Sequence, residues 1–191
     1  MKKKDFTKCI LAFLFLFSLT ACTSQNPAAP EEENVAIETP SGIRGLGKIE
    51  MTGMDLKTGK AVGNEILTEK VNVLMVWQPD CYFCEEEAKA MEKILPELEN
   101  TKIIGLVVTE DKEAAQARVE EWGLTFENIL LRVDQIYGIS PEIQTTPSVI
   151  FVNEKGEEIA EKQLGALMGF DTVDSLAKEW KARLNALEAM E

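Results

Sequence analysis

From about Gly45 to the end of the chain, the pattern of hydrophobic and polar positions divides the sequence into two kinds of segment that follow one another. Short continuous apolar runs are typical of buried strands, and apolar residues at helical spacing are typical of amphipathic helices. The strand signals predict a leading hairpin at 48–54 and 60–62 and further strands at 71–77, 102–108, 128–133, 148–152 and 157–164. The helical patterns predict helices at 85–95, 111–122 and 171–190. This order predicts an α/β fold in which helices flank both faces of a mixed central sheet that carries an N-terminal hairpin.

Three residues mark the expected ends of the helices. Pro96 lies within the first helical stretch and should kink or end it, because proline lacks the backbone N–H that a helix uses. Gly123 should stop the second helix, since glycine accepts the left-handed conformation common at a helix C-terminus. Asp171 should cap the third helix with its side-chain oxygen.

Two cysteines, Cys81 and Cys84, lie where the predicted strand 71–77 gives way to the first predicted helix. At a helix N-terminus, unsatisfied N–H groups and the helix dipole favour a thiolate over a thiol. A strand followed by a Cys-x-x-Cys pair and a helix indicates a dithiol that cycles with a disulfide.

The first 21 residues have the pattern of an export signal. A basic start, Lys2 to Lys4, precedes the apolar run Ile10–Leu19, which is too short to span a bilayer. The run closes with Leu19-Thr20-Ala21-Cys22, which resembles the bacterial lipoprotein box, where the cysteine is lipidated. An ordinary signal peptide with an incidental cysteine is the alternative. We expect a lipoprotein signal peptide at 1–21, lipidated Cys22 and a disordered linker at 22–44, and one globular domain at 45–191.

The fate of the other two cysteines limits what Cys81 and Cys84 can do. Cys9 would leave with the signal and Cys22 would carry acyl chains, so two thiols would remain. A tetrahedral zinc site needs about four ligands, which two cysteines and a chain without histidine do not easily supply. A disulfide-stapled module would need further pairs. We therefore expect no metal and no other cofactor.

The charge of the chain bears on its partners. The 191 residues carry a net charge of −13. Without residues 1–21, which hold four lysines and one aspartate, 16 basic and 32 acidic residues remain and the net charge is −16. So acidic a surface disfavours nucleic acid and anionic lipid as partners. A solvated, soluble exterior is enough to explain it.

With these elements in order, residues 45–187 resemble the thioredoxin fold, specifically the membrane-tethered TlpA/ResA-like reductases. The resemblance rests on Trp77, the Cys81/Cys84 pair, Glu87, Asp134 with Tyr137-Gly138-Ile139, Thr145-Thr146-Pro147 and Asn153-Glu154-Lys155-Gly156. The chain departs from the family pattern at Asp80, where many members carry a tryptophan. It departs again at Tyr82-Phe83, where a proline is common.

The resemblance implies a cis bond between Thr146 and Pro147, lying against the cysteine pair. It also implies that Trp77, Thr146 and Pro147 form the substrate-binding surface. The alternative for Pro147 is an ordinary proline at the entry of a strand. Glu87 matches a glutamate that such reductases carry, and it shares a helix face with Cys84. There it would relay a proton to or from the thiol; the alternative is a plain surface glutamate.

Acidic residues crowd the predicted start of the first helix. Asp80, Glu85 and Glu86 are explained by capping and by the preference of a helix N-terminus for negative charge. A second interpretation is that they disfavour the thiolate and make the pair less oxidising, which suits a reductase. The sequence leaves both interpretations open.

The sequence thus predicts a thiol–disulfide oxidoreductase, lipid-anchored at the extracytoplasmic face of a bacterial cell membrane. Cys81 would attack a client disulfide and Cys84 would resolve the mixed disulfide. Its partners would be disulfide-containing client proteins and a membrane electron donor. Two alternatives use the same dithiol: a Cu(I)-binding or delivery module, and a thiol peroxidase. The peroxidase pattern has Thr or Ser where this chain has Gln78.

Overall fold

The computed structural model describes residues 46–190. The expected signal peptide, Cys22 and linker therefore lie outside the described residues. The described residues all fall within one compact unit. Over 46–190, the helices are too short or too polar for any of them to span a bilayer.

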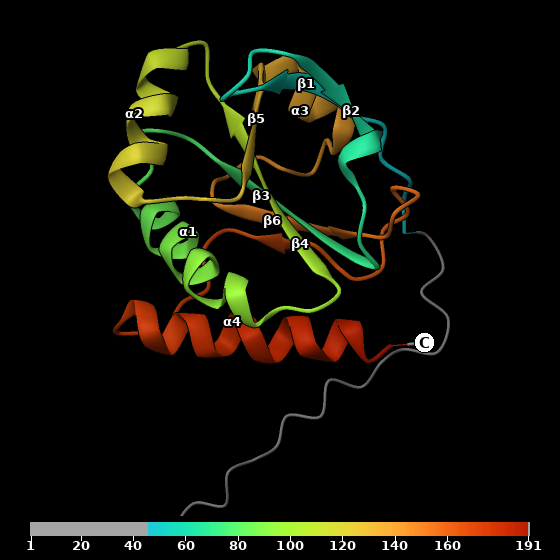
Figure 1. Ribbon diagram of the computed structural model, residues 1–191, viewed down its shortest axis with the longest axis vertical. Helices are drawn as coiled ribbons and strands as arrows, with labels where there is room; N and C mark the ends of the chain where they lie inside the picture. Colours follow the sequence, from blue (N-terminus) through green and yellow to red (C-terminus); the bar gives the residue numbers. More distant parts are fainter. Residues whose placement is uncertain (1–45, 191) are drawn as a thin grey trace, which may run out of the picture. The chain divides into compact units, whose positions relative to one another are not determined.

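A seven-stranded mixed sheet forms the centre of the described region (Figure 1). Its strands are β1 (Thr52–Asp55), β2 (Ala61–Gly63), β3 (Val71–Trp77), β4 (Thr101–Val108), β5 (Glu127–Leu131), β6 (Ser148–Val152) and β7 (Gln163–Leu164). They lie in the order β2-β1-β5-β4-β3-β6-β7, with β3, β4 and β5 parallel and the other pairs antiparallel. β3 is buried along its whole length, which explains why its sequence is a continuous apolar run rather than an alternation.

Four helices cover the two faces of this sheet. They are α1 (Tyr82–Ile94), α2 (Lys112–Trp122), α3 (Val133–Ile139) and α4 (Val173–Glu188), with 3₁₀ turns at Asn64–Ile66 and Leu95–Glu97. Residues of α1, α2 and α4 share one apolar core with one side of β3, and α4 runs along α1 (Figure 1). The other side of β3 shares a second core with α3 and with residues that precede β1. The mixed sheet with helices on both faces is as predicted.

The structure tests the three residues that were predicted to mark helix ends. Pro96 ends α1, because the chain tightens into the 3₁₀ turn Leu95–Glu97. Gly123 stops α2 with a left-handed φ of 68°. The predicted cap Asp171 is wrong by one residue: Thr172 caps α4, because its hydroxyl accepts a hydrogen bond from the backbone N–H of Ser175.

The structure differs from the prediction at a short helix and at the last strand, and it agrees at the leading hairpin. The short helix α3 was not predicted, since seven residues that include a glycine give only two turns of pattern. The strand expected over 157–164 is reduced to β7, with single bridges at Glu157 and Glu158. The leading hairpin is confirmed: β1 and β2 pair antiparallel, and β1 continues the sheet beside β5.

Candidate active site

Cys81 and Cys84 form a disulfide directly after β3, with their Cα atoms 5.2 Å apart. Cys81 is the N-cap of α1, and its sulfur accepts a hydrogen bond of 3.2 Å from the backbone N–H of Cys84. Cys84 is fully buried, whereas Cys81 is partly exposed. An incoming sulfur can therefore reach Cys81 first, which is the asymmetry that a nucleophile and a resolving partner require.

The loop before β6 lies beside this disulfide. The Thr146–Pro147 peptide bond is cis, as expected from the resemblance. Pairing of β6 with β3 sets Ser148 opposite Val76, which brings Pro147 to the end of the sheet where Cys81 emerges. The Thr146 hydroxyl also lies 3.4 Å from the Gln78 side-chain oxygen, in the turn that leads to Cys81. The structure thus brings Thr146 and Pro147 to the cysteine pair; their contact with substrate stays a prediction.

Trp77 does not line this surface. Its side chain is 0% exposed, so it cannot touch a docked protein. The expectation that Trp77 contacts substrate is corrected: it is a core residue. The indole N–H donates to Asn128 Oδ1 at 3.0 Å, and the ring packs against Trp122 with centroids 5.1 Å apart. Trp77 therefore belongs to the same buried core as Cys84, against which Cys81 also packs.

Glu87 is also buried, at 1% exposure, which rules out the plain surface glutamate. It lies one helical turn after Cys84 on α1, and both of its carboxylate oxygens accept hydrogen bonds. Oε1 accepts from the backbone N–H of Leu167 at 2.7 Å, and Oε2 accepts from the indole N–H of Trp180 on α4. The carboxylate thus links three segments of the chain: α1, the loop at Leu167 and α4.

The electrostatics of Glu87 fit a group that exchanges a proton. Burial raises the pKa of the Glu87 carboxyl above its ordinary value, because the charged form loses hydration. The hydrogen bonds from Leu167 and Trp180 and the charge of Arg183 hold the pKa down in part, while Glu86 adds to the rise. The Glu87 carboxyl, one helical turn from Cys84, therefore holds a proton more readily than an exposed glutamate does.

Large apolar side chains are exposed around the same end of the sheet. Within 46–190 the exposed large hydrophobic residues are Tyr82, Phe83, Val133, Tyr137, Leu164 and Met168. They lie at the start of α1, on α3, on β7 and in the loop after β7. A hollow of about 90 Å³ lies between α3 and the loop that carries Thr146. Tyr82 and Phe83, which follow Cys81 directly, pack edge to face with ring centroids 5.4 Å apart, and exposed apolar groups next to a reactive site are candidates for contact with a partner.

Sequence reasoning did not find this exposed surface, nor the partners of Glu87. Tyr82 and Phe83 were singled out only as a departure from the family pattern. No local signal distinguishes an exposed Met168 from a buried one, because the loop that carries it has no periodicity. The partners Leu167 and Trp180 lie 80 and 93 residues from Glu87 along the chain.

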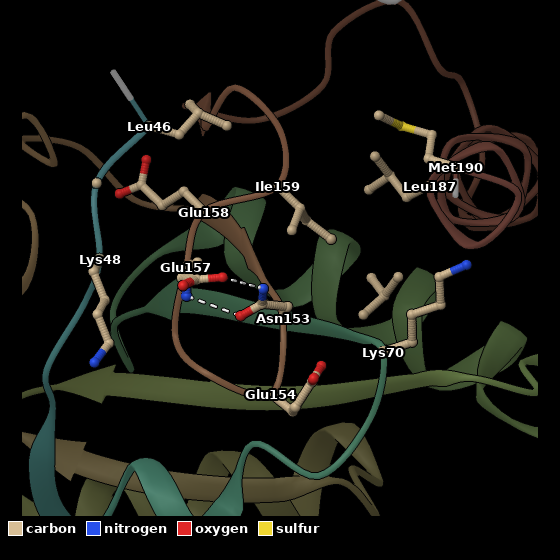
Figure 2. Close-up of a pocket in the computed structure, with 12 residues that line it drawn as sticks. Leu46, Lys48, Lys70, Asn153, Glu154, Glu157, Glu158, Ile159, Leu187 and Met190 are labelled. Atoms are coloured by element: carbon tan, nitrogen blue, oxygen red, sulfur yellow. Dashed lines mark hydrogen bonds between the residues drawn. The ribbon is translucent and has the colours of Figure 1, made fainter. Parts of the chain in front are cut away.

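A much larger cavity, of about 750 Å³, lies at the opposite end of the sheet (Figure 2). It opens beside Val71, the first residue of β3, whereas Cys81 follows the last; a strand of that length spans about 23 Å. Several of its polar side chains already have partners: Figure 2 shows Asn153 bonded to the Glu157 carboxylate and backbone. Lys70 Nζ donates to the Glu188 carbonyl. Within 46–190, no three His, Cys, Asp or Glu side chains are grouped to hold a metal ion.

Comparison with known proteins supports the fold. No family model matches the chain, and no curated protein matches it. Solved structures do match it. A secreted Mycobacterium tuberculosis disulfide oxidoreductase, described as homologous to E. coli DsbE, is 22% identical with a TM-score of 0.57, covering 71% of this chain and 95% of its own. The thioredoxin domain of a Bacteroides vulgatus thiol-disulfide oxidoreductase is 24% identical with a TM-score of 0.58, over 73% and 98%.

A third match is a thiol-disulfide isomerase from Corynebacterium glutamicum, 22% identical with a TM-score of 0.59, covering 77% of this chain and 99% of its own. At these identities the likeness establishes the fold. The chain has the thioredoxin-like fold predicted from its sequence, and it carries a Cys-x-x-Cys disulfide at the start of α1.

Proposed function

We propose that this protein is a thiol–disulfide oxidoreductase that reduces disulfides in client proteins through Cys81 and Cys84. The observation that carries the proposal is the disulfide itself: Cys81 is partly exposed at a helix N-terminus, and Cys84 is buried one helical turn before the buried Glu87. The exposed apolar residues around it would receive an unfolded or extended client. The similar structures named above are oxidoreductases or isomerases of disulfides.

In the reduced protein, the Cys81 thiolate attacks one sulfur of a client disulfide, and the other client sulfur leaves as a thiolate that takes up a proton. The Cys84 thiol then loses its proton, which Glu87 is placed to accept. The Cys84 thiolate attacks Cys81, and the second client sulfur leaves. One client disulfide becomes two thiols while the Cys81/Cys84 dithiol becomes the disulfide, so two electrons and two protons pass to the client.

Catalysed reduction of insulin by dithiothreitol tests this proposal. We expect the wild-type protein to accelerate precipitation of the insulin B chain, and Cys81→Ser to leave the uncatalysed rate. Equal rates with wild type and Cys81→Ser would overturn the proposal. Cu(I) titration of the reduced protein and a peroxide-consumption assay on the same sample test the two alternative uses of the dithiol.

We further propose that the protein is lipid-anchored through Cys22 at the extracytoplasmic face of a bacterial cell membrane, where a membrane electron donor returns Cys81 and Cys84 to the reduced form. The support is the sequence Leu19-Thr20-Ala21-Cys22 after a basic start and an apolar run. Two or more acyl chains anchor a protein stably where one does not. Wild type should partition into the detergent phase of a membrane extract, and Cys22→Ala should not. Recovery of wild type in the aqueous phase would exclude the anchor.

A further inference from the structure

We propose that Arg118 is a positioning residue for Cys81: it clamps the turn that presents the cysteine and supplies the cation that favours its thiolate. The inference rests on the proposed function, since it concerns how readily Cys81 reacts. Arg118 belongs to α2, 37 positions further along the sequence from Cys81. No feature of the Cys-x-x-Cys segment itself points to it.

The turn from Gln78 to Cys81 carries the chain from the end of β3 to the start of α1. A backbone hydrogen bond of 3.2 Å from the Cys81 N–H to the Gln78 carbonyl closes it. The Pro79 carbonyl is bonded from outside the turn: Arg118 Nε donates to it at 3.0 Å. A guanidinium is a strong, directional donor, and its hydrogen bonds are charge-assisted. The position of Cys81 therefore depends on a contact from α2.

Arg118 also balances the charge around the disulfide. Among the described residues, it is the charged side chain that hydrogen-bonds to the 78–84 segment. Four acidic residues lie within or near that segment. Asp80 belongs to the turn, Glu85 and Glu86 lie in the first turns of α1 with Glu85 paired to Lys89, and Glu121 of α2 is paired to Arg118. Residues 144–147 of the neighbouring loop carry no charge.

The expected consequence follows from simple electrostatics. A guanidinium stays charged at every working pH, and a nearby cation favours the charged form of a thiol. The acidic residues act in the opposite direction. Removing Arg118 should leave their effect unopposed and reduce the fraction of Cys81 present as thiolate.

Four variants separate the charge of Arg118 from its packing. Arg118→Gln removes the cation, and Arg118→Lys keeps a positive charge without the planar fork. Glu121→Gln leaves Arg118 in place but removes its ion-pair partner. Glu120→Gln is the matched control, because Glu120 is, like Glu121, an exposed residue of α2, and its side chain has no hydrogen bond among residues 46–190.

The readout is the rate at which Cys81 in the purified, reduced protein reacts with iodoacetamide as a function of pH, with the site confirmed by peptide mass. At pH 7 and low salt we expect Arg118→Gln to react about threefold more slowly than wild type, an effect the size of a partly exposed ion pair. Arg118→Lys should recover most of the rate. Glu121→Gln should react about twofold faster, and Glu120→Gln should match wild type.

Salt gives a readout that a purely structural role would not move. In about 1 M salt the Debye length falls to about 3 Å, so the difference between Arg118→Gln and wild type should shrink. A wild-type rate for Arg118→Gln, or a threefold loss unchanged by salt, would overturn the proposal. If Arg118→Gln fails to fold, equal rates for Glu121→Gln and Glu120→Gln would overturn it instead. Alkylation requires no client, so a failure of insulin reduction does not affect this test.

Discussion

At the carboxyl end of β3 the protein has a disulfide and exposed apolar side chains, whereas at the amino end it has a far larger cavity lined by charged groups, several of which already have partners. The cavity at the amino end holds about 750 Å³, and the hollow between α3 and the loop that carries Thr146 holds about 90 Å³. Size alone would therefore assign function to the amino end.

The chemistry of the two ends gives the opposite answer. At the amino end, Asn153 and Glu157 satisfy each other, Lys70 bonds a helix C-terminal carbonyl, and no cysteine lines the cavity. At the carboxyl end, Tyr82 is 71% exposed and Met168 is 73% exposed, without apolar partners over most of their surface. Exposed apolar side chains at the end that carries the disulfide are therefore a better guide to the functional site than the volume of a cavity.

The largest expected effect lies with the two cysteines, which should behave differently although they form one bond. Cys84→Ser should accumulate mixed disulfides with client proteins, because the resolving thiol is gone, and Cys81→Ser should trap almost none. Both variants should lose disulfide reduction by about 10³-fold or more. Non-reducing gels of cell extracts probed for the protein provide the measurement. Equal trapping by both variants would break the contrast between an exposed and a buried sulfur.

Glu87→Gln tests whether the buried carboxyl serves the chemistry of the carboxyl end. General-base catalysis contributes roughly 10²–10⁴ in rate, so insulin reduction at pH 7 should slow by about 10². Glu85→Gln, on the same helix but paired with Lys89 at the surface, is the control and should change the rate less than about twofold. A variant as fast as wild type between about pH 6 and 8 would show that Glu87 only holds Leu167 and Trp180 in place.

The support beneath the disulfide can be tested at Gly105. A Cβ atom at this position would lie 2.0 Å from Asn128 Oδ1 and 2.8 Å from Trp77 Nε1, so alanine would disrupt their hydrogen bond. We expect Gly105→Ala to lower the free energy of unfolding by about 1–3 kcal/mol. Gly138→Ala is the matched control, since no atom lies within 4 Å of its Cβ, and it should be neutral or slightly stabilising. Urea denaturation of both variants compares them; equal stabilities would refute the role of the close contact.

A smaller effect is expected in how the free energy of unfolding depends on pH, through the buried Glu87. Because burial raises the pKa of Glu87 above about 4.5, the folded protein keeps this proton to a higher pH than the unfolded chain does. The stabilisation from the neutral carboxyl is complete below pH 4.5 and is lost as the pH rises through the raised pKa. The free energy of unfolding of wild type relative to Glu87→Gln should therefore fall over that interval. A difference that rises or stays flat would contradict the raised pKa.

The smallest effect is expected at the amino end. Glu157→Gln removes a charge from the large cavity, where the carboxylate bonds only Asn153 among the described side chains. Insulin reduction should stay within about twofold of wild type, because the disulfide lies beyond the full length of β3. A loss comparable to that of Glu87→Gln would mean that the two ends are coupled, and the comparison between them would need revision.

Local signals in the sequence determined most of the secondary structure and the position of the disulfide. The apolar run 71–77 became β3 at the predicted bounds, and Gly123 and Pro96 ended their helices as expected. These outcomes follow from backbone conformation and from burial of a single segment, both of which neighbouring residues decide. The pairing of Cys81 with Cys84 across one helical turn is local in the same sense.

The tertiary structure decided which way the supporting side chains face and what they meet. Trp77 belongs to the core because Asn128, 51 residues away, accepts its N–H. Glu87 is buried because α4 and the loop at Leu167 close over it, and Arg118 reaches Pro79 because α2 lies beside the turn. A sequence pattern gives the face of a helix that is apolar, but a single polar side chain within it acquires its partners only when distant segments pack together. For that reason the sequence located the reactive sulfurs, and only the packed structure showed what positions them.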